Sequence, residues 1–321
     1  TDTEVVTKLL DYYYKKYQGN TLEAIVKVML RVRGSYALGI MLKEEPGVIY
    51  TVRKDSPLIV GKNEQGCLIA SDVPAILKYT RNVYYIDNLE IARLTKEDVT
   101  FYNIDKEEIT KEPVEIKWDA EAAEKGGFEH FMMKEIHEQP KAVRDTVNSY
   151  VKDGRIDLSS VELTDEDIRG LSRLYIVACG SAYHVGIAAK YVIEDLAKLP
   201  VEVDLASEFR YRDPILDKDA LVVIISQSGE TADSLAALRE AKSRGIRTLA
   251  VVNVVGSSIA READNVFYTL AGPEIAVATT KAYSTQLAAA YLMAVHFALV
   301  RETIDEVYYG KLVEELLLLP D

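Results

Sequence analysis

The pattern of apolar and polar positions changes near Trp118. Before it, helical patterns over Thr1–Tyr17 and Thr21–Arg31 precede short strand-like runs separated by Gly, Pro, Asn and Asp. Helices followed by successive strands predict a layered α+β domain with mostly antiparallel pairing. The runs are Ser35–Leu42, Val48–Val52, Cys67–Ala70, Val83–Ile86, Ile91–Leu94 and Val99–Ile104.

A charged segment from Asp119 to Gly170 follows, and its composition is typical of a connection between domains. Its pattern predicts a helix over Glu129–Glu138 that ends at Gln139-Pro140, because proline cannot donate the backbone hydrogen bond of a helix interior. A second helix is predicted over Lys141–Tyr150.

After this segment, continuous β-branched runs alternate with helical patterns, which predicts a doubly wound α/β domain with a parallel sheet. Ligands of such sheets bind outside the carboxyl ends of the strands. The apolar stretch Leu287–Val300, with His296 inside it, is too short to span a bilayer and predicts a buried helix. The predicted strands are Leu174–Cys179, Val201–Leu205, Leu221–Ile225, Thr248–Val252 and Val266–Leu270, and the helices are Tyr183–Leu199, Thr231–Arg244, Ser258–Ala263 and Thr279–Val300.

Composition narrows the possible partners and cofactors. The length of 321 residues suggests two domains, and the net charge of -13 argues against nucleic acid. Only Cys67 and Cys179 are present, which excludes a four-cysteine zinc site and fits a reducing cytosol. The polar start shows no signal peptide. The histidines are scattered, so we predict no metal site; they are His130, His137, His184 and His296.

The sharpest local feature is Ser226-Gln227-Ser228-Gly229-Glu230-Thr231, between a predicted strand and a predicted helix. Hydroxyls, an amide and a glycine meet there at a helix N-terminus, whose free N–H groups and positive dipole end suit a phosphate monoester. The alternative is an ordinary helix cap, with Ser228 as N-cap and Thr231 at the third helical position.

Two further loops lie at the same predicted edge. Cys179-Gly180-Ser181-Ala182 follows a strand, and with the Ser226 loop it should form a pocket. Cys179 itself reads as a small core residue rather than a nucleophile. In the segment from Glu274 to Lys281, hydroxyls could close over a polyol, while Lys281 could pair with a phosphate or a carboxylate. The sheet carries no G-x-G-x-x-G and no P-loop motif, so a small phosphorylated metabolite fits better than a nucleotide.

Four segments in order resemble the first sugar isomerase (SIS) domain of the glutamine:fructose-6-phosphate amidotransferases. The upstream half resembles the later part of that family's glutaminase domain, an Ntn-hydrolase-like fold, and its hinge. The SIS-like segments are Cys179–His184, Ala206–Tyr211, Ser226–Asp233 and Glu274–Tyr283, and the upstream ones are Thr1–Val5, Arg33–Ala37, Ile69–Asp72 and Lys134–Pro140.

The resemblance implies an enzyme that makes glucosamine 6-phosphate from fructose 6-phosphate and glutamine in the cytoplasm, with no cofactor and as a homodimer. It implies a partial glutaminase domain over residues 1–118, a hinge over 119–168, the SIS domain over 169–303, and a connection to a second SIS domain over 304–321. Asp2 would bind the α-amino group of glutamine. The residues that would hold the sugar phosphate are Ser181, Ser226, Gln227, Ser228, Thr231, Val277 and Thr279.

Departures from the family pattern limit what the chain can do alone. Ala182 replaces a frequent serine, which removes one hydroxyl from the phosphate site, and Thr279 replaces a serine but keeps its hydroxyl. The family's nucleophilic cysteine would precede Thr1 and its isomerisation base would follow Asp321, so no catalytic residue is assigned and these 321 residues should be inactive alone. Alternatives are a stand-alone phosphosugar-binding regulatory module and a fructosamine-6-phosphate deglycase.

Overall fold

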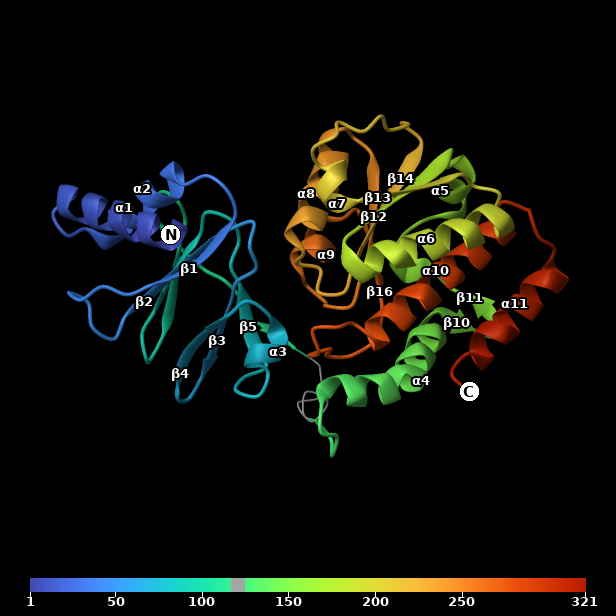
Figure 1. Cartoon of the computed structure of the whole chain (residues 1–321), viewed down its shortest axis with the longest axis horizontal. Coiled ribbons are helices and arrows are strands. Elements are labelled where there is room, and N and C mark those ends of the chain that lie inside the picture. Colours follow the sequence, from blue (N-terminus) through green and yellow to red (C-terminus); the bar gives the residue numbers. More distant parts are fainter. Residues whose placement is uncertain (117–124) are drawn as a thin grey trace. The chain divides into compact units, whose positions relative to one another are not determined.

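The computed structural model describes residues 1–116 and 125–321 (Figure 1). The chain divides into two compact units, Thr1–Lys117 and Trp118–Asp321. The first unit begins with α1 (Asp2–Lys16) and α2 (Thr21–Arg31). Asn20 caps α2, since its side chain accepts a hydrogen bond from the Glu23 backbone N–H at 3.0 Å.

Two antiparallel sheets and the short helix α3 (Val73–Ile76) follow in the first unit, and the sheets confirm the predicted pairing. Ile25 of α2 packs on Val52 and Ile91 of one sheet, and a second cluster of buried side chains lies between the two sheets. One sheet has the order β1 (Tyr36–Ile40), β2 (Ile49–Lys54), β6 (Ile91–Leu94), β7 (Val99–Tyr102), β8 (Glu108–Ile109), and the other β4 (Gly66–Ala70), β3 (Ile59–Asn63), β5 (Asn82–Tyr85), β9 (Val114–Glu115).

The second unit is built on a parallel sheet of five strands, as predicted. Its central strand β14 is buried along its whole length, which explains the unbroken apolar run in the sequence. From β12 the chain adds β13 on one side of the strand and then β14, β15 and β16 on the other side. The topological switch point therefore lies between β12 and β14. The order is β13 (Val201–Leu205), β12 (Arg173–Ala178), β14 (Ala220–Ser226), β15 (Arg247–Val252), β16 (Asn265–Tyr268).

Helices cover both faces of this sheet (Figure 1). One face packs on α4 (Phe131–Tyr150), α5 (Asp165–Gly170), α6 (Gly180–Leu196), α10 (Lys281–Val300) and α11 (Glu306–Leu318). The other face packs on α7 (Ala206–Phe209), α8 (Ala232–Ser243) and α9 (Ser258–Glu262). A hairpin, β10 (Val151–Lys152) and β11 (Arg155–Ile156), and a short 3-10 turn at Ser159–Val161 join α4 to α5.

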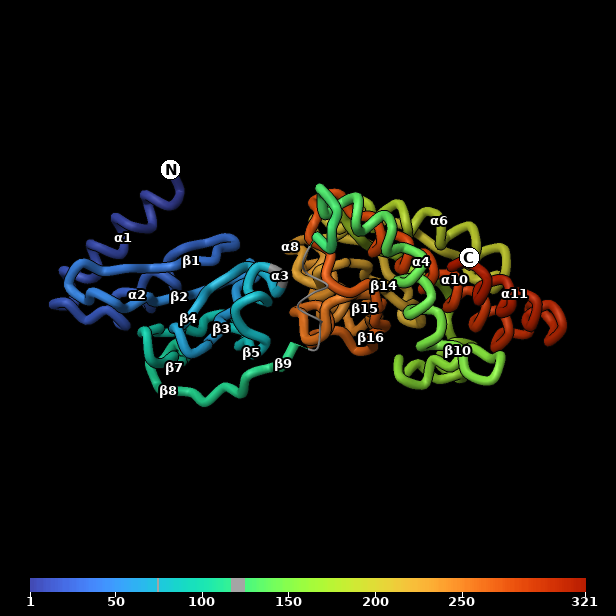
Figure 2. Tube along the Cα trace, turned by 90° about the horizontal axis from the view of Figure 1, so that it is seen from below, coloured from blue at the N-terminus to red at the C-terminus, as the bar shows by residue number. Residues whose placement is uncertain are grey.

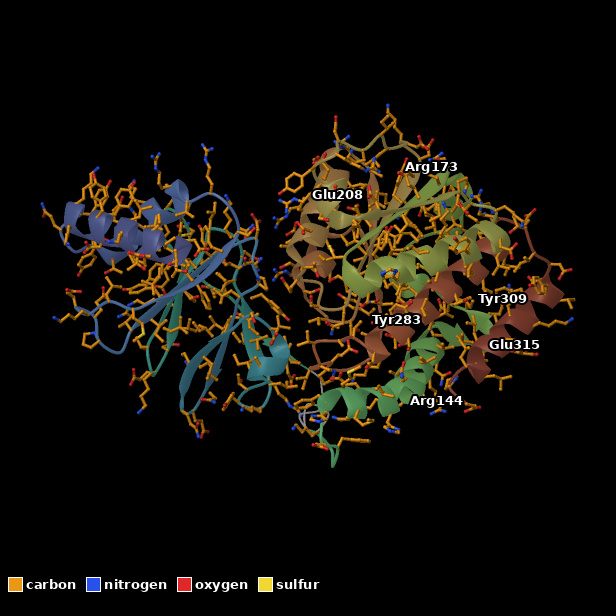
Figure 3. The ribbon with its side chains drawn as sticks, in the orientation of Figure 1. Arg144, Arg173, Glu208, Tyr283, Tyr309 and Glu315 are labelled. Atoms are coloured by element: carbon orange, nitrogen blue, oxygen red, sulfur yellow. The ribbon has the colours of Figure 1, made fainter. Side chains whose placement is uncertain are left out.

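The C-terminal helix α11 was not predicted. It is anchored by Tyr309, which Figure 3 labels on this helix. The Tyr309 hydroxyl accepts a hydrogen bond from the Ile156 backbone N–H at 2.7 Å. Val313 and Leu316 add to the same core, so α11 is part of the second unit's packing.

The prediction of two helices separated at Pro140 is wrong, because α4 runs unbroken through this residue. Proline lacks the N–H that would bond to the Ile136 carbonyl. The Gln139 side chain supplies the missing donor, with its Nε2 placed 3.1 Å from that carbonyl oxygen. A neighbouring side chain thus replaces the lost backbone bond.

The long helix α10 confirms the predicted buried helix, but the expectation that this segment is too short to span a bilayer is wrong, because the helix has 20 residues. Among residues 1–116 and 125–321 it alone is long and apolar enough to cross a membrane, yet 67% of the relevant window is buried inside the protein. Its buried side chains share one core cluster with residues of α4 and α6. Figure 2 shows the trace of α10 beside those of α4 and α6. These contacts are those of a core helix.

We expect His296 of α10 to make folding sensitive to acid. Its side chain is 15% exposed, Asp165 Oδ1 lies 3.9 Å from Nε2, and the buried Nδ1 has no partner in the described chain. Burial lowers the pKa of His296 below its ordinary value of 6.5, with Arg155 acting in the same direction and Asp165 and Asp157 opposing it. The unfolded chain therefore binds the proton more tightly, and stability falls as pH decreases below that value.

We expect His296→Gln to flatten this dependence. Because glutamine does not titrate, the free energy of unfolding of the variant should change less than that of the parent between about pH 7 and pH 5. The difference between the two slopes should be at most ~1.4 kcal/mol per pH unit, the limit for one titrating group. Urea unfolding at a series of pH values measures the difference. Equal slopes for the two proteins would contradict this origin of the acid sensitivity.

Candidate phosphosugar pocket

The first wall of the candidate site is the junction between β12 and α6. Helix α6 begins at Gly180, earlier than the predicted start at Tyr183, so Gly180 and Ser181 belong to its first turn. Cys179 occupies the N-cap position without a side-chain capping bond, and Gly180 has a positive φ of 57°. Among the residues that the structure describes, no side chain caps the first N–H groups of α6, so they are open toward this edge of the sheet.

The second wall is the Ser226 loop at the end of β14. Ser226 is 3% exposed, and its Oγ accepts a hydrogen bond from the Gly229 N–H and lies 3.1 Å from Thr231 Oγ1. The Ser228 Oγ accepts from the Glu230 N–H at 3.1 Å. These bonds fold the loop into a compact turn.

The structure rules out the alternative in which Ser228 caps the following helix. Helix α8 begins at Ala232, its N-cap is Thr231, and no side chain of the described residues caps it. The Thr231 hydroxyl lies against Ser226 instead. The N-terminus of α8 is therefore open at the loop, as an anion-binding helix start requires.

Neighbouring elements hold the loop from behind. The Gly229 carbonyl accepts from the Ile259 N–H at 2.9 Å, and Glu230 Oε1 accepts from the Ser258 N–H at 2.7 Å. The Gln227 carbonyl accepts from the Asn253 N–H at 3.1 Å, which leaves the Gln227 side chain to line the pocket.

The third wall is the segment from Glu274 to Thr279, which precedes α10. Its shape depends on the Glu274 carboxylate, which accepts from the Thr279 hydroxyl at 2.6 Å and from the Thr280 and Ala282 N–H groups at 2.8 and 3.1 Å. Glu274 thus satisfies the N-terminus of α10. Val277 is fully exposed at the tip of this segment.

All seven residues predicted to hold the sugar phosphate line one open pocket of about 370 Å³. This pocket lies at the carboxyl ends of β12 and β14. Cys179, Gly180 and Ala182 line it as well, and Ala182 presents no hydroxyl. The seven are Ser181, Ser226, Gln227, Ser228, Thr231, Val277 and Thr279.

Two other candidates lie outside this pocket. Asp2 is exposed in the first turn of α1, in the first unit, where its Oδ1 accepts from the Thr3 N–H at 2.8 Å. Lys281 is buried and pairs with Glu138 Oε2 at 2.6 Å. Of the two predicted partners of Lys281, a phosphate or a carboxylate, the structure shows the carboxylate.

Hydroxyls and helix N-termini dominate the chemistry of the pocket. Among its described lining residues only Glu274 carries a charge, and its oxygens are occupied by the hydrogen bonds described above. A bound anion would meet the hydroxyls and the open N-termini of α6 and α8. Within the described chain, no cluster of three or more His, Cys, Asp or Glu side chains could hold a metal ion.

Sequence reasoning missed two buried amides at this edge. Gln286 is 3% exposed and lines the pocket from α10; its only sequence signal is a polar side chain inside an apolar run. Asn253 links the Ser226 loop, through its N–H bond to the Gln227 carbonyl, to the chain that leads into the third wall. Its Oδ1 accepts from the Ala271 N–H at 2.9 Å and its Nδ2 donates to the Gly272 carbonyl at 2.7 Å. Its position directly after β15 was the available signal.

Comparison with known proteins agrees with the fold of the second unit. Residues 167–296 match the SIS domain family. Isomerizing glutamine–fructose-6-phosphate aminotransferases from Clostridium acetobutylicum and Methanosarcina mazei are 56% and 44% identical to this chain over its whole length. The chain spans about half of each relative, 52% and 53% respectively.

Solved structures of similar proteins share the fold of the second unit. The C-terminal domain of glucosamine-fructose-6-phosphate aminotransferase from Francisella tularensis superimposes with a TM-score of 0.60 and 42% identity, covering 61% of this chain and 56% of that one. The fold is also shared by a putative phosphosugar isomerase from Clostridium difficile. Its TM-score is 0.51 and its identity 20%, covering 59% of this chain and 52% of that one.

The parallel sheet, its switch-point pocket and the family match identify residues 167–296 as a SIS domain. Identity along the whole chain then makes this chain a homologue of the isomerizing glutamine–fructose-6-phosphate aminotransferases. The resemblance inferred from the motifs is thereby confirmed.

Proposed function

We propose that the pocket binds the phosphate and sugar of fructose 6-phosphate, and that the chain belongs to an enzyme that converts this sugar and glutamine to glucosamine 6-phosphate. The observation that carries the proposal is the convergence of hydroxyl-bearing loops and two open helix N-termini at one switch point. The names of the homologues supply the substrate class.

Each wall has a distinct role in this proposal. The phosphate lies at the N-terminus of α8, where Ser228, Thr231 and the Gln227 amide donate hydrogen bonds to it and Ser226 holds the loop in shape. Ser181, Val277 and Thr279 line the part of the pocket that takes the sugar. Because none of the described lining residues is a cation, binding rests on neutral donors and helix dipoles.

The first unit is proposed to be the later part of a glutaminase domain. Its two antiparallel sheets are consistent with such a fold, and Asp2 is the proposed ligand of the glutamine α-amino group. We further propose a cytoplasmic homodimer, on the strength of the family resemblance. The deglycase alternative has less support, because the resemblance to glutaminase extends along the first unit.

Calorimetric titration of the 321-residue chain tests the substrate assignment. Fructose 6-phosphate should bind, while fructose and inorganic phosphate at the same concentrations should bind at least about tenfold more weakly, because each satisfies only one part of the pocket. Ser172→Ala, an exposed serine just before β12, serves as a control and should bind like the parent. Equal binding of fructose and fructose 6-phosphate would contradict the proposal.

A further inference from the structure

One face of α4 contacts the chain from the end of β16 to the start of α10. At its C-terminal end, the Tyr150 hydroxyl exchanges hydrogen bonds of 3.0 Å with the Tyr268 backbone, accepting from its N–H and donating to its carbonyl. Thr146 Oγ1 accepts from the Leu270 N–H at 3.0 Å. Ala142 then packs against Ala271 and Ala282.

The N-terminal half of α4 continues this stripe to the pocket segment itself. Glu135 is 2% exposed, and its Oε1 accepts from the backbone N–H groups of Ile275 and Ala276 at 2.6 and 3.1 Å. Gln139 Oε1 accepts from the Ser284 hydroxyl at 2.5 Å. Glu135, Gln139, Ala142, Thr146 and Tyr150 recur at spacings of three or four residues, so they share one helix face.

Glu135 holds the part of this segment that Glu274 does not reach. The Glu274 bonds fix the start of α10, whereas Ile275 and Ala276 precede the tip of the pocket wall at Val277. Removing the Glu135 carboxylate would leave these two N–H groups without their acceptor. A lost charge-assisted bond of this kind is costly in a buried site.

We propose that Glu135 is a positioning residue for the pocket: from α4 it fixes the Glu274–Thr279 segment and so sets the geometry of the sugar-binding wall. The inference rests on the proposed phosphosugar function. Figure 2 shows α4 running beside α10, which is the arrangement that brings this helix to the pocket segment. The residues of α4 touch the wall rather than the ligand, so the effect on binding is indirect.

The test compares Glu135→Ala with Glu135→Gln in the 321-residue chain. Alanine removes the acceptor, whereas the glutamine oxygen can still accept both N–H bonds. Asp145→Ala is the matched control, because it removes a carboxylate from α4 that bonds to Lys141 and not to the pocket segment. Two quantities are measured for each protein: amide hydrogen exchange at Ile275 and Ala276 without ligand, and calorimetric affinity for fructose 6-phosphate.

We expect Glu135→Ala to accelerate exchange at both amides by about tenfold and to weaken sugar binding by about tenfold, with Glu135→Gln and Asp145→Ala close to the parent. Faster exchange confined to residues 275–279 separates positioning from general unfolding. Unchanged exchange in Glu135→Ala would overturn the inference. If the parent binds fructose 6-phosphate, equal affinity of Glu135→Ala for this sugar would overturn it as well. If the parent binds no fructose 6-phosphate, the proposed function fails, while locally faster exchange still supports the positioning contact.

Discussion

Replacing Ser226 with alanine is expected to weaken the binding of fructose 6-phosphate by about 30-fold, corresponding to ~2 kcal/mol. The Ser226 Oγ is the acceptor for the Gly229 N–H and the neighbour of the Thr231 hydroxyl, and its residue is 3% exposed. Alanine leaves that buried N–H without an acceptor and releases the turn that presents the phosphate donors. Titration calorimetry measures the loss.

Ser243→Ala is the control for this prediction. Ser243 ends α8, and its Oγ donates at 2.8 Å to the Glu240 carbonyl of the same helix, remote from the loop. The same chemical change there should leave affinity within about twofold of the parent. Equal affinities for Ser226→Ala and Ser243→Ala would show that the loop does not form the phosphate site.

Gly229→Ala is expected to lower the free energy of unfolding of the second unit by about 3 kcal/mol. Gly229 has a φ of 65°, which disfavours any side chain, and a Cβ built on it would lie 2.0 Å from Ser257 Oγ and 2.6 Å from Ser257 Cβ. Ser257 is 0% exposed, and its Cβ is fixed to the backbone, so rotation of the side chain cannot relieve the clash. Urea unfolding followed by circular dichroism measures the loss, and phosphosugar binding should fall with it.

Gly310→Ala provides the matched substitution in α11. A Cβ added at Gly310 would have no heavy atom of the described residues within 4 Å, and the φ of Gly310 is not positive, so alanine should stabilise the helix by about 0.5–1 kcal/mol. The double variant Gly229→Ala/Ser257→Gly should recover the steric part of the loss and keep the part due to φ. The explanation fails if Gly229→Ala is as stable as Gly310→Ala.

The sequence predicts the structure best where a local pattern of residues is compatible with only one arrangement of strands and helices. The β-branched runs of β12, β14 and β15 are buried on both faces, so they could only form a parallel sheet, and that topology brings their following loops to one edge. This is why the loops after β12 and β14 could be predicted to form one pocket, whereas the seven individual residues that line it were proposed from the family resemblance.

The missed features depend on side-chain contacts that a periodic pattern does not encode, and two of these contacts join distant parts of the chain. Strand β3 contains Gly61, which weakens the strand pattern but is required because a Cβ there would lie 2.5 Å from Ile76 Cδ1. The continuity of α4 depends on the Gln139 side chain, which outweighs the usual effect of Pro140. Glu135 bonds to N–H groups 140 and 141 residues away, and no local spacing in the sequence indicates such a contact.

A crystal structure of this chain with fructose 6-phosphate tests the central claim most directly. We expect the phosphate to lie at the N-terminus of α8, within hydrogen-bond distance of Ser228, Thr231 and the Gln227 amide, with the sugar between Ser181 and Thr279. A sugar phosphate bound elsewhere, or an empty pocket in crystals at ligand concentrations that saturate the protein in solution, would contradict the account.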